Sequence, residues 1–177
     1  MPKTSIINQI KQKIREIENF PKTGVNFKDI TPVLADKKLF KLIINQLAKH
    51  CQKLRIDTVI GIDARGFLLA APLAYKLGAG LVIVRKKGKL PPETISQEYQ
   101  LEYGLDCLEI TKDSIKSGGK ALIVDDVLAT GGTAKASWQL AKKAGLKVME
   151  IIFLAELKFL KGRNKLKGKK IFSLIKY

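Results

Sequence analysis

The sequence is poor in the residues that most covalent and metal-dependent sites need. Among its 177 residues there are two cysteines, Cys51 and Cys107, and one histidine, His50. Two cysteines are too few to cross-link a chain of this length, so we expect reduced thiols and a cytoplasmic protein. His, Cys, Asp and Glu do not gather with metal-ligand spacing, and a histidine-based triad would depend on His50 alone. The sequence therefore predicts neither a disulfide framework nor a metal centre built by the protein itself.

Long apolar runs are also missing. No stretch of about 18 uncharged apolar residues occurs, so no membrane-spanning helix is expected. Residues 1–19 carry scattered charges and lack an apolar block before a cleavage site, so we do not expect a secretory signal there. A length of 177 residues with an apolar fraction of 46% fits one packed domain.

Acidic residues are scarce beside basic ones. The 33 Lys and Arg residues exceed the 16 Asp and Glu residues, which gives a net charge of +17. Such an excess favours anionic partners without identifying them. Much of it lies between Lys158 and Lys170, where we predict a solvated basic face rather than a nucleic-acid platform.

Apolar periodicity predicts alternating helices and strands. Isoleucines from Ile6 to Ile17 recur at helical spacing and predict an amphipathic N-terminal helix that ends at Phe20-Pro21. Residues 22–32 have no period and predict a loop, and Asp36 is placed to cap the next helix. Further helices are predicted at about residues 37–54, 66–77 and 132–144. Strands are predicted at residues 58–62, 81–84, 121–124, 148–154 and 171–175, with two short strands between 98 and 110.

This alternation indicates βαβ units, and therefore an α/β fold with a parallel sheet flanked by helices on both faces. Residues 85–96 contain Gly88, Pro91 and Pro92 without a period, which predicts a long loop of the kind that often covers a site. Three loops that carry charged or phosphate-binding residues each follow a predicted strand. Because ligands bind outside the carboxyl ends of parallel strands, we expect these loops to meet at one edge of the sheet.

The most informative of the three is the segment from Ala121 to Thr133. Ala121–Val124 is a short apolar run typical of a strand buried on both faces. Asp125 and Asp126 follow at its end. Thr130-Gly131-Gly132-Thr133 then begins a helix and offers free backbone N–H groups, which is an anion site. A phosphate on the glycines would leave both carboxylates free to accept hydrogen bonds from sugar hydroxyls.

This arrangement resembles the signature of the type I phosphoribosyltransferases, in which two acidic residues precede a Thr-Gly-Gly-Thr loop. The resemblance implies that Asp125 and Asp126 hold the ribose 2′- and 3′-hydroxyls of 5-phospho-α-D-ribose 1-diphosphate (PRPP). It also implies the fold of that family, with an N-terminal hood over residues 1–35 and a flexible active-site loop and strand over residues 86–105. The residues that would hold the 5-phosphate are Ala129, Thr130, Gly131, Gly132 and Thr133.

The two other loops suit the diphosphate of the same substrate. An anion near Arg65 would meet a guanidinium and the free amides of a helix start. Four of the five residues from Arg85 to Lys89 are basic, and such cations, together with Mg²⁺, stabilise a diphosphate leaving group. The resemblance assigns Asp63, Ala64 and Arg65 to the pyrophosphate loop, and Arg85 and Lys89 to its cationic partners.

Two further stretches resemble one family in particular, the adenine phosphoribosyltransferases. Residues 20–32 resemble their hood, and residues 88–104, with Leu101-Glu102-Tyr103-Gly104, resemble their mobile loop and the strand after it. The likeness extends from about residue 14 to residue 177. It implies that Val25, Asn26 and Lys28 contact the base, largely through backbone groups.

The same resemblance implies that Glu102 is the acid/base near the purine nitrogens, with Tyr103 beside it. The residues to which it gives catalytic roles are Glu102, Asp125, Asp126 and Arg65. Lys28 departs from the family, because many relatives carry Arg there and Lys lacks the planar fork of a guanidinium. Thr23 likewise replaces a commoner Pro.

The resemblance implies a purine salvage reaction. Adenine and PRPP would give AMP and diphosphate, with Mg²⁺ carried mainly by the diphosphate, in a homodimer with no membrane or nucleic-acid partner. Two other readings stay open. One is a phosphoribosyltransferase for another base, such as hypoxanthine, xanthine or orotate. The other is a regulator that senses PRPP and binds nucleic acid, which the basic surface would suit, although no helix-turn-helix module precedes the domain.

Overall fold

The computed structural model describes residues 3–20, 22–24, 26–100 and 104–177. The chain divides into two compact units, residues 1–46 and 47–177. A single domain over residues 1–177 stays a prediction.

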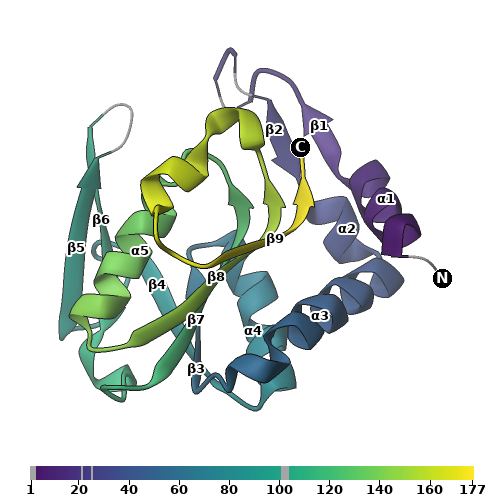
Figure 1. The fold of residues 1–177 in the computed structure, drawn as a ribbon. Helices are drawn as coiled ribbons and strands as arrows, with labels where there is room; N and C mark the ends of the chain where they lie inside the picture. Colours follow the sequence, from purple (N-terminus) through teal and green to yellow (C-terminus); the bar gives the residue numbers. More distant parts are fainter. Residues whose placement is uncertain (1–2, 21, 25, 101–103) are drawn as a thin grey trace. The chain divides into compact units, whose positions relative to one another are not determined.

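The first unit contains a small antiparallel pair of strands between helices. Its elements are α1 (Lys3–Lys13), β1 (Arg15–Ile17), β2 (Phe27–Asp29), α2 (Thr31–Ala35) and most of α3 (Lys37–Cys51), which runs on into the second unit (Figure 1). Asp36 caps α3 as predicted, because its Oδ1 accepts hydrogen bonds from the backbone N–H groups of Lys38 at 3.0 Å and Leu39 at 3.1 Å.

Two predictions for this unit were wrong in part. The N-terminal helix ends at Lys13, and Arg15–Ile17 pairs with Phe27–Asp29 instead of continuing it. The segment predicted as a loop therefore contains a strand. Arg15 Nη2 donates to Asp29 Oδ2 at 2.6 Å across the pair. Pairing with β2 determines the local structure of Arg15–Ile17. The helical spacing of isoleucines along the chain gives no information about such a partner strand.

Seven strands of the described part of the second unit form one sheet, in the order β5-β6-β4-β3-β7-β8-β9 (Figure 1). Five neighbouring strands of this sheet run parallel, namely β4, β3, β7, β8 and β9. At the edge, β5 and β6 form an antiparallel hairpin, and β6 pairs antiparallel with β4. Their bounds are β3 (Thr58–Ile62), β4 (Gly80–Lys86), β5 (Thr94–Gln100), β6 (Leu105–Thr111), β7 (Lys120–Leu128), β8 (Lys147–Glu156) and β9 (Ile171–Lys176).

Two helices connect parallel neighbours in this sheet. Helix α4 (Arg65–Leu77) joins β3 to β4, and α5 (Gly132–Lys143) joins β7 to β8. The two crossovers run in opposite directions along the sheet. Because such connections are right-handed, α4 and α5 lie on opposite faces, as the sequence predicted for an α/β fold. The direction reverses between β3 and β7, and a reversal of this kind opens a crevice at the carboxyl ends of the two strands.

Burial on both faces explains the composition of the central strands. Ile60 and Ile62 on β3, Ile123 on β7 and Phe153 on β8 are all fully buried. They are β-branched or aromatic residues, which pack well on a pleated surface that is covered from both sides. The sheet therefore holds the carboxyl ends of β3 and β7 rigidly side by side.

Several strands are longer than the sequence predicted. β7 continues through the acidic pair to Leu128, so Asp125 and Asp126 lie inside the strand rather than after it. β5 begins at Thr94, so the predicted loop of residues 85–96 is shorter. The neighbouring strands β8 and β6 extend these segments through ladder pairing, which charged residues do not prevent at a strand end.

Three smaller features concern His50, the cysteines and the helices. His50 Nε2 lies 2.9 Å from Glu150 Oε2, and the His50 ring stacks on Phe172. Cys51 and Cys107 are free, and burial raises the pKa of the Cys51 thiol to about 12. None of the helices that the structure describes is long and apolar enough to cross a membrane.

Candidate functional site

The carboxyl ends of the paired strands β3 and β7 bring two of the predicted loops together. Arg65 is the first residue of α4, directly after β3, and its Nε lies 2.7 Å from Asp126 Oδ2 on β7. A Cβ atom on Gly66 would lie 2.8 Å from the carbonyl oxygen of Val124 and 3.0 Å from Asp125 Oδ1. Only a residue without a side chain lets the first turn of α4 approach β7 this closely.

The phosphate-type turn follows β7. Gly131 has a φ of +79°, a conformation that favours glycine, and it is the N-cap of α5. In the part of the chain that the structure describes, no side chain forms a capping hydrogen bond at the start of α5. Backbone N–H groups at an uncapped helix start, together with the helix dipole, attract an anion. The helix start at Gly132 agrees with the sequence prediction, while phosphate binding by Ala129, Thr130, Gly131, Gly132 and Thr133 stays a prediction.

The two carboxylates of the acidic pair, Asp125 and Asp126, are buried next to each other, which disfavours their ionised forms. Asp125 Oδ1 accepts a hydrogen bond from the backbone N–H of Asp126 at 2.9 Å. Burial, and next the neighbouring Asp126 charge, raise the pKa of Asp125 well above its ordinary value. Burial also raises the pKa of Asp126, although the Arg65 guanidinium opposes that shift. Two crowded carboxylates gain from hydroxyl donors, because each new hydrogen bond stabilises the ionised form.

The loop that follows β4 contacts the loop that follows β3. Asp63 Oδ2 accepts a hydrogen bond from Arg85 Nε at 3.1 Å, and Lys89 Nζ lies 3.9 Å from the same oxygen. Arg85 Nη1 also donates to the backbone carbonyl of Lys89 at 3.2 Å. The peptide bond between Asp63 and Ala64 is cis. The structure therefore groups the residues predicted for the diphosphate, with one carboxylate holding two cations.

The predicted base-binding residues lie in the first unit. Lys28 on β2 is buried and forms an ion pair with Glu16 on β1, and burial lowers its pKa. Asn26 is exposed immediately before β2. Val25, Glu102 and Tyr103 lie outside the described residues, so their roles stay predictions.

Sequence reasoning missed the 3₁₀ helix η4 (Gly162–Leu166), whose residues fall in the basic run that we interpreted as a solvated face. The backbone of Gly162 lies directly against Gly131, so that a Cβ atom on either glycine would overlap a carbonyl oxygen. Arg163 forms a two-pronged ion pair with Glu156, with distances of 2.7 Å from Nε to Oε1 and 2.8 Å from Nη2 to Oε2. Lys165 Nζ lies 4.0 Å from the position of a Cβ atom on Gly132.

The signal for this contact is weak in the sequence. An Arg among lysines, next to a glycine, is the only local hint, and nothing in it identifies Gly131 as the partner. Tyr99 on β5 was missed for the same reason, although its ring lies 3.9 Å from the Cβ position on Gly132. Both contacts join segments that are far apart in the chain.

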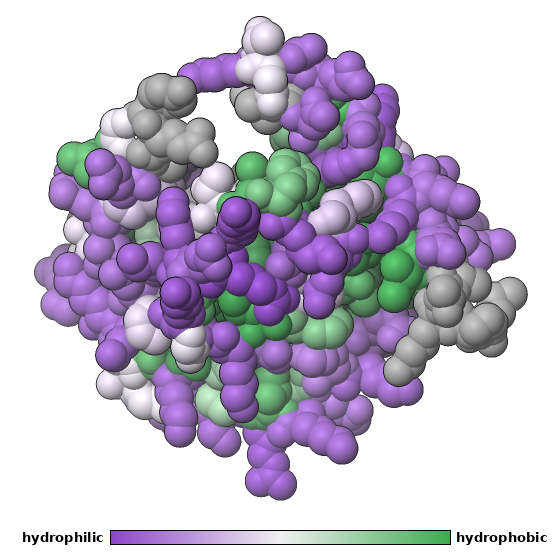
Figure 2. Space-filling view, turned by 45° about the horizontal axis from the view of Figure 1, so that its top comes forward, coloured by the Kyte–Doolittle hydropathy of each residue, from purple (hydrophilic) through white to green (hydrophobic). Residues whose placement is uncertain are grey.

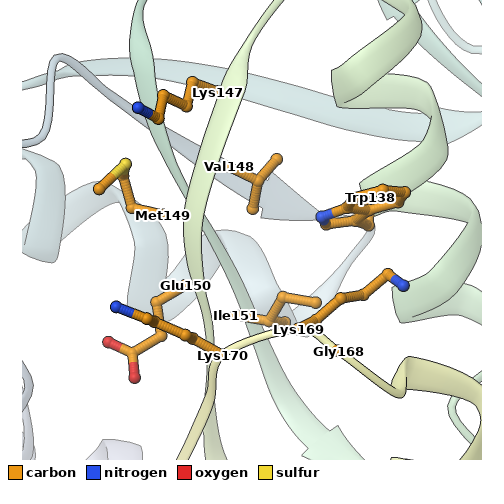
Figure 3. A pocket seen from close by; sticks show the side chains of 9 residues that line it. All are labelled: Trp138, Lys147, Val148, Met149, Glu150, Ile151, Gly168, Lys169 and Lys170. Atoms are coloured by element: carbon orange, nitrogen blue, oxygen red, sulfur yellow. The ribbon is translucent and has the colours of Figure 1, made fainter.

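A pocket of about 330 Å³ lies elsewhere, at the amino end of β8. Figure 3 shows Trp138 and Lys169 on one side of the strand, and Lys169 Nζ lies 4.2 Å from the centre of the indole ring. The residues that line it are Trp138, Lys147, Val148, Met149, Glu150, Ile151, Gly168, Lys169 and Lys170. The phosphate-type turn is at the other end of the sheet, where parallel strands place ligands. The molecular face in Figure 2 is mostly hydrophilic, as expected for a chain with 33 basic residues.

Comparison with known proteins gives one consistent result. Residues 31–175 match the family model described as phosphoribosyl transferase domain. The adenine phosphoribosyltransferase of Thermoanaerobacter sp. (strain X514) is 56% identical over 97% of this chain and 99% of its own length. That of Geobacter metallireducens is 54% identical over 97% of this chain and 100% of its own length.

Solved structures agree. The adenine phosphoribosyltransferase of Thermoanaerobacter pseudethanolicus superposes with a TM-score of 0.94 at 56% identity, over 97% of this chain and 99% of that one. The Saccharomyces cerevisiae enzyme, solved with adenine and an imino-altritol bisphosphate, gives a TM-score of 0.92 at 39% identity, over 97% and 99% of the two chains.

Proposed function

The chain belongs to the adenine phosphoribosyltransferases, and from this premise we propose that it transfers ribose 5-phosphate from PRPP to adenine, giving AMP and diphosphate. One observation carries the proposal within the structure itself. The uncapped start of α5 at Gly131 follows β7, which carries two crowded carboxylates, Asp125 and Asp126, and β7 lies where the helical crossovers change direction along the sheet. An anion site next to hydroxyl acceptors is what a sugar phosphate requires.

The turn and the acidic pair would bind different parts of the ribose 5-phosphate. The 5-phosphate accepts hydrogen bonds from the N–H groups of residues 131–133, and the Thr133 hydroxyl adds one more. The 2′- and 3′-hydroxyls donate to Asp125 and Asp126. Because Asp126 is already held by Arg65, the sugar meets a fixed carboxylate rather than a mobile one.

The cations that now surround Asp63 would receive the diphosphate. Arg85 and Lys89 each share that single carboxylate, so a ligand with several negative charges competes well for them. Arg65 lies at the start of α4, where its guanidinium and the helix amides can meet the same ligand. These groups stabilise negative charge as it accumulates on the leaving diphosphate.

The chemistry needs no covalent nucleophile. N9 of adenine forms a bond to C1′ of the ribose while the bond from C1′ to the diphosphate oxygen breaks, and the electron pair of that bond leaves with diphosphate. Positive charge develops on the ribose ring, as in glycosyl transfer generally. The proton on the purine ring passes to a base, for which we propose Glu102, with contacts from Val25, Asn26 and Lys28 fixing the base.

Mg²⁺ is the cation that we propose for this reaction, since diphosphate and carboxylate oxygens are the hard ligands it prefers. Asp125 and Asp126 are carboxylates of the kind that Mg²⁺ prefers, so an ion on the substrate can approach them. When bound, the ion would neutralise charge on the diphosphate. We propose that the substrate carries the ion, because its diphosphate supplies several oxygen ligands.

A homodimer in the cytoplasm completes the proposal. Leu68 and Tyr75 lie seven residues apart on α4, which places them on one face of the helix, and they are 50% and 90% exposed. Large apolar residues exposed together on one face suit a two-fold interface with a second copy of the chain. Equilibrium sedimentation at micromolar concentration checks this, and a monomer throughout would contradict it.

One assay separates the proposal from its alternatives. The protein is mixed with Mg²⁺, PRPP and adenine, hypoxanthine, xanthine or orotate in turn, and the nucleotide of each base and diphosphate are measured. We expect turnover with adenine alone. Turnover of another base without adenine would overturn the base assignment. No turnover with any base, together with salt-sensitive binding of RNA or DNA, would favour the regulator.

A further inference from the structure

Tyr99 lies at the junction of three elements of the second unit. It is on β5, directly opposite Asp106 on β6 in the register of the hairpin. Its hydroxyl donates a hydrogen bond to Asp106 Oδ2 at 3.3 Å. The same oxygen lies 2.9 Å from Lys86 Nζ, at the end of β4. One carboxylate thus joins a tyrosine to a lysine, and that lysine directly follows Arg85.

The other side of Tyr99 meets the phosphate turn. Its ring lies 3.9 Å from the Cβ position on Gly132. Burial raises the pKa of Tyr99, and the side chain of Thr133, the next residue of the turn, opposes this shift and therefore lies near the Tyr99 hydroxyl. A chain of contacts therefore runs from the turn through Tyr99 to Asp106 and Lys86. It connects the proposed 5-phosphate site with β4, the strand that carries Arg85.

We propose that Tyr99 is a positioning residue that couples occupation of the phosphate turn to the diphosphate side of the site at the end of β4. The inference rests on the proposed function, because it takes the anion at the turn to be the 5-phosphate of the sugar. Neither Tyr99 nor Asp106 needs to touch the substrate for this role.

The physical basis is that a hydroxyl has only one hydrogen to donate. The Tyr99 hydrogen goes to Asp106 when the turn is empty, so in our proposal the Tyr99 oxygen accepts the hydrogen of Thr133. A phosphate is a charged and stronger acceptor, so it takes that hydrogen when it binds. The Thr133 oxygen then accepts from Tyr99 instead, and Asp106 is released from its long 3.3 Å contact. Asp106 then holds Lys86 more firmly and fixes the end of β4 beside Arg85.

The test measures this coupling directly. The affinity of the full-length protein for magnesium diphosphate is measured by calorimetry, with and without saturating ribose 5-phosphate, a pair of ligands that cannot react. In the unchanged protein, we expect ribose 5-phosphate to tighten diphosphate binding by about 3- to 10-fold, the size of one net hydrogen bond. By reciprocity, diphosphate should tighten ribose 5-phosphate by the same factor.

Tyr99→Phe keeps the ring and removes only the hydroxyl. We expect it to bind each ligand alone within about twofold of the unchanged protein, and to lose the coupling factor. Asp106→Asn should lose it as well. Thr133→Ser, which keeps the hydroxyl, should retain it, whereas Thr133→Val should not. Glu98→Gln is the matched control, because Glu98 is the exposed neighbour of Tyr99 on the same strand.

The possible failures are distinct. If the unchanged protein binds neither ribose 5-phosphate nor diphosphate, the proposed function fails. If it binds both independently, or if Tyr99→Phe keeps the full coupling, the positioning role is overturned while the function stands. Near-equal melting temperatures for Tyr99→Phe, Glu98→Gln and the unchanged protein exclude a folding defect as the cause.

Discussion

The backbones of Gly131 and Gly162 touch. A Cβ atom on Gly131 would overlap the carbonyl oxygen of Gly162, and one on Gly162 would overlap that of Ala129. The phosphate turn is therefore supported from behind by η4, a segment that lies about 30 residues further along the chain. Its shape depends on this contact as well as on its own sequence.

The first prediction concerns that contact. Gly162→Ala should destabilise the protein by about 1–3 kcal/mol and raise the KM for PRPP, because the alanine methyl pushes η4 away from the turn. Gly131→Ala should cost more, because its φ of +79° adds backbone strain. Chemical denaturation and steady-state kinetics measure both effects.

Gly168→Ala is the control for the backbone term. Gly168 has a φ of +76°, and a Cβ atom there would meet nothing within 4 Å. If Gly168→Ala proves as costly as Gly131→Ala, then φ strain alone explains the loss and the packing contact contributes little.

A second prediction concerns the acidic pair. Asp125→Asn should abolish turnover, since the sugar hydroxyls lose an ionised acceptor, and should stabilise the fold at pH 7 by about 1 kcal/mol. The stabilisation arises because burial and the Asp126 charge raise the pKa of Asp125. A variant with near-normal activity would refute the role in sugar binding.

The pH dependence of this effect has a definite sign. An acid whose pKa is raised on folding destabilises the folded state when it is ionised. That cost is fully present above the raised pKa and vanishes as the pH falls to the unfolded value of about 3.9. The stability gap between Asp125→Asn and the unchanged protein should therefore narrow on acidification, which urea titrations from pH 7 to pH 4 can follow.

The third prediction concerns Arg163 and Glu156. Arg163→Lys keeps the charge but cannot make two parallel hydrogen bonds, so we expect a loss of about 1 kcal/mol after allowing for the partly exposed Arg163 side chain. The KM for PRPP should rise with it, because η4 supports the turn. Arg163→Met should lose more.

The stabilisation by the Arg163–Glu156 ion pair should be lost at acidic pH. Arg163 holds the pKa of Glu156 below its ordinary value of 4.5. A lowered pKa stabilises the fold above the ordinary value, and this stabilisation is lost as the pH falls through the folded value. The difference in unfolding free energy between Arg163→Met and the unchanged protein should shrink below pH 4.5. An unchanged difference would show that packing, and not the ion pair, carries the effect.

The fourth prediction tests Lys165 as an additional cation at the turn. Its Nζ lies 4.0 Å from the Cβ position on Gly132. Lys165→Met should raise the KM for PRPP by about threefold at low ionic strength, and the effect should fade at high salt because the side chain is exposed. Lys167→Met, two residues away and also exposed, is the control. Equal effects of the two variants would mean that only the overall charge matters.

Local sequence by itself determined the central strands and the phosphate turn. Ile60 and Ile123 lie in short apolar runs rich in β-branched residues, which favour buried strands, and the Gly131-Gly132 pair favours a turn because Gly131 has a positive φ. The ion pair between Arg65 and Asp126 was foreseeable to the extent that parallel strands bring their carboxyl ends together. In each case the physical cause lies within a few residues or follows from the βαβ rule.

Only the tertiary structure decided the contacts that join distant segments. Arg15–Ile17 became a strand because β2 pairs with it, and β7 extends past Asp126 because β8 runs alongside. The support of Gly131 by Gly162, and the contact of Tyr99 with the turn, depend on the packing of elements about 30 residues apart. Periodicity and spacing carry information on which face of an element is apolar, but the partner of a given residue is fixed only when the whole chain has folded.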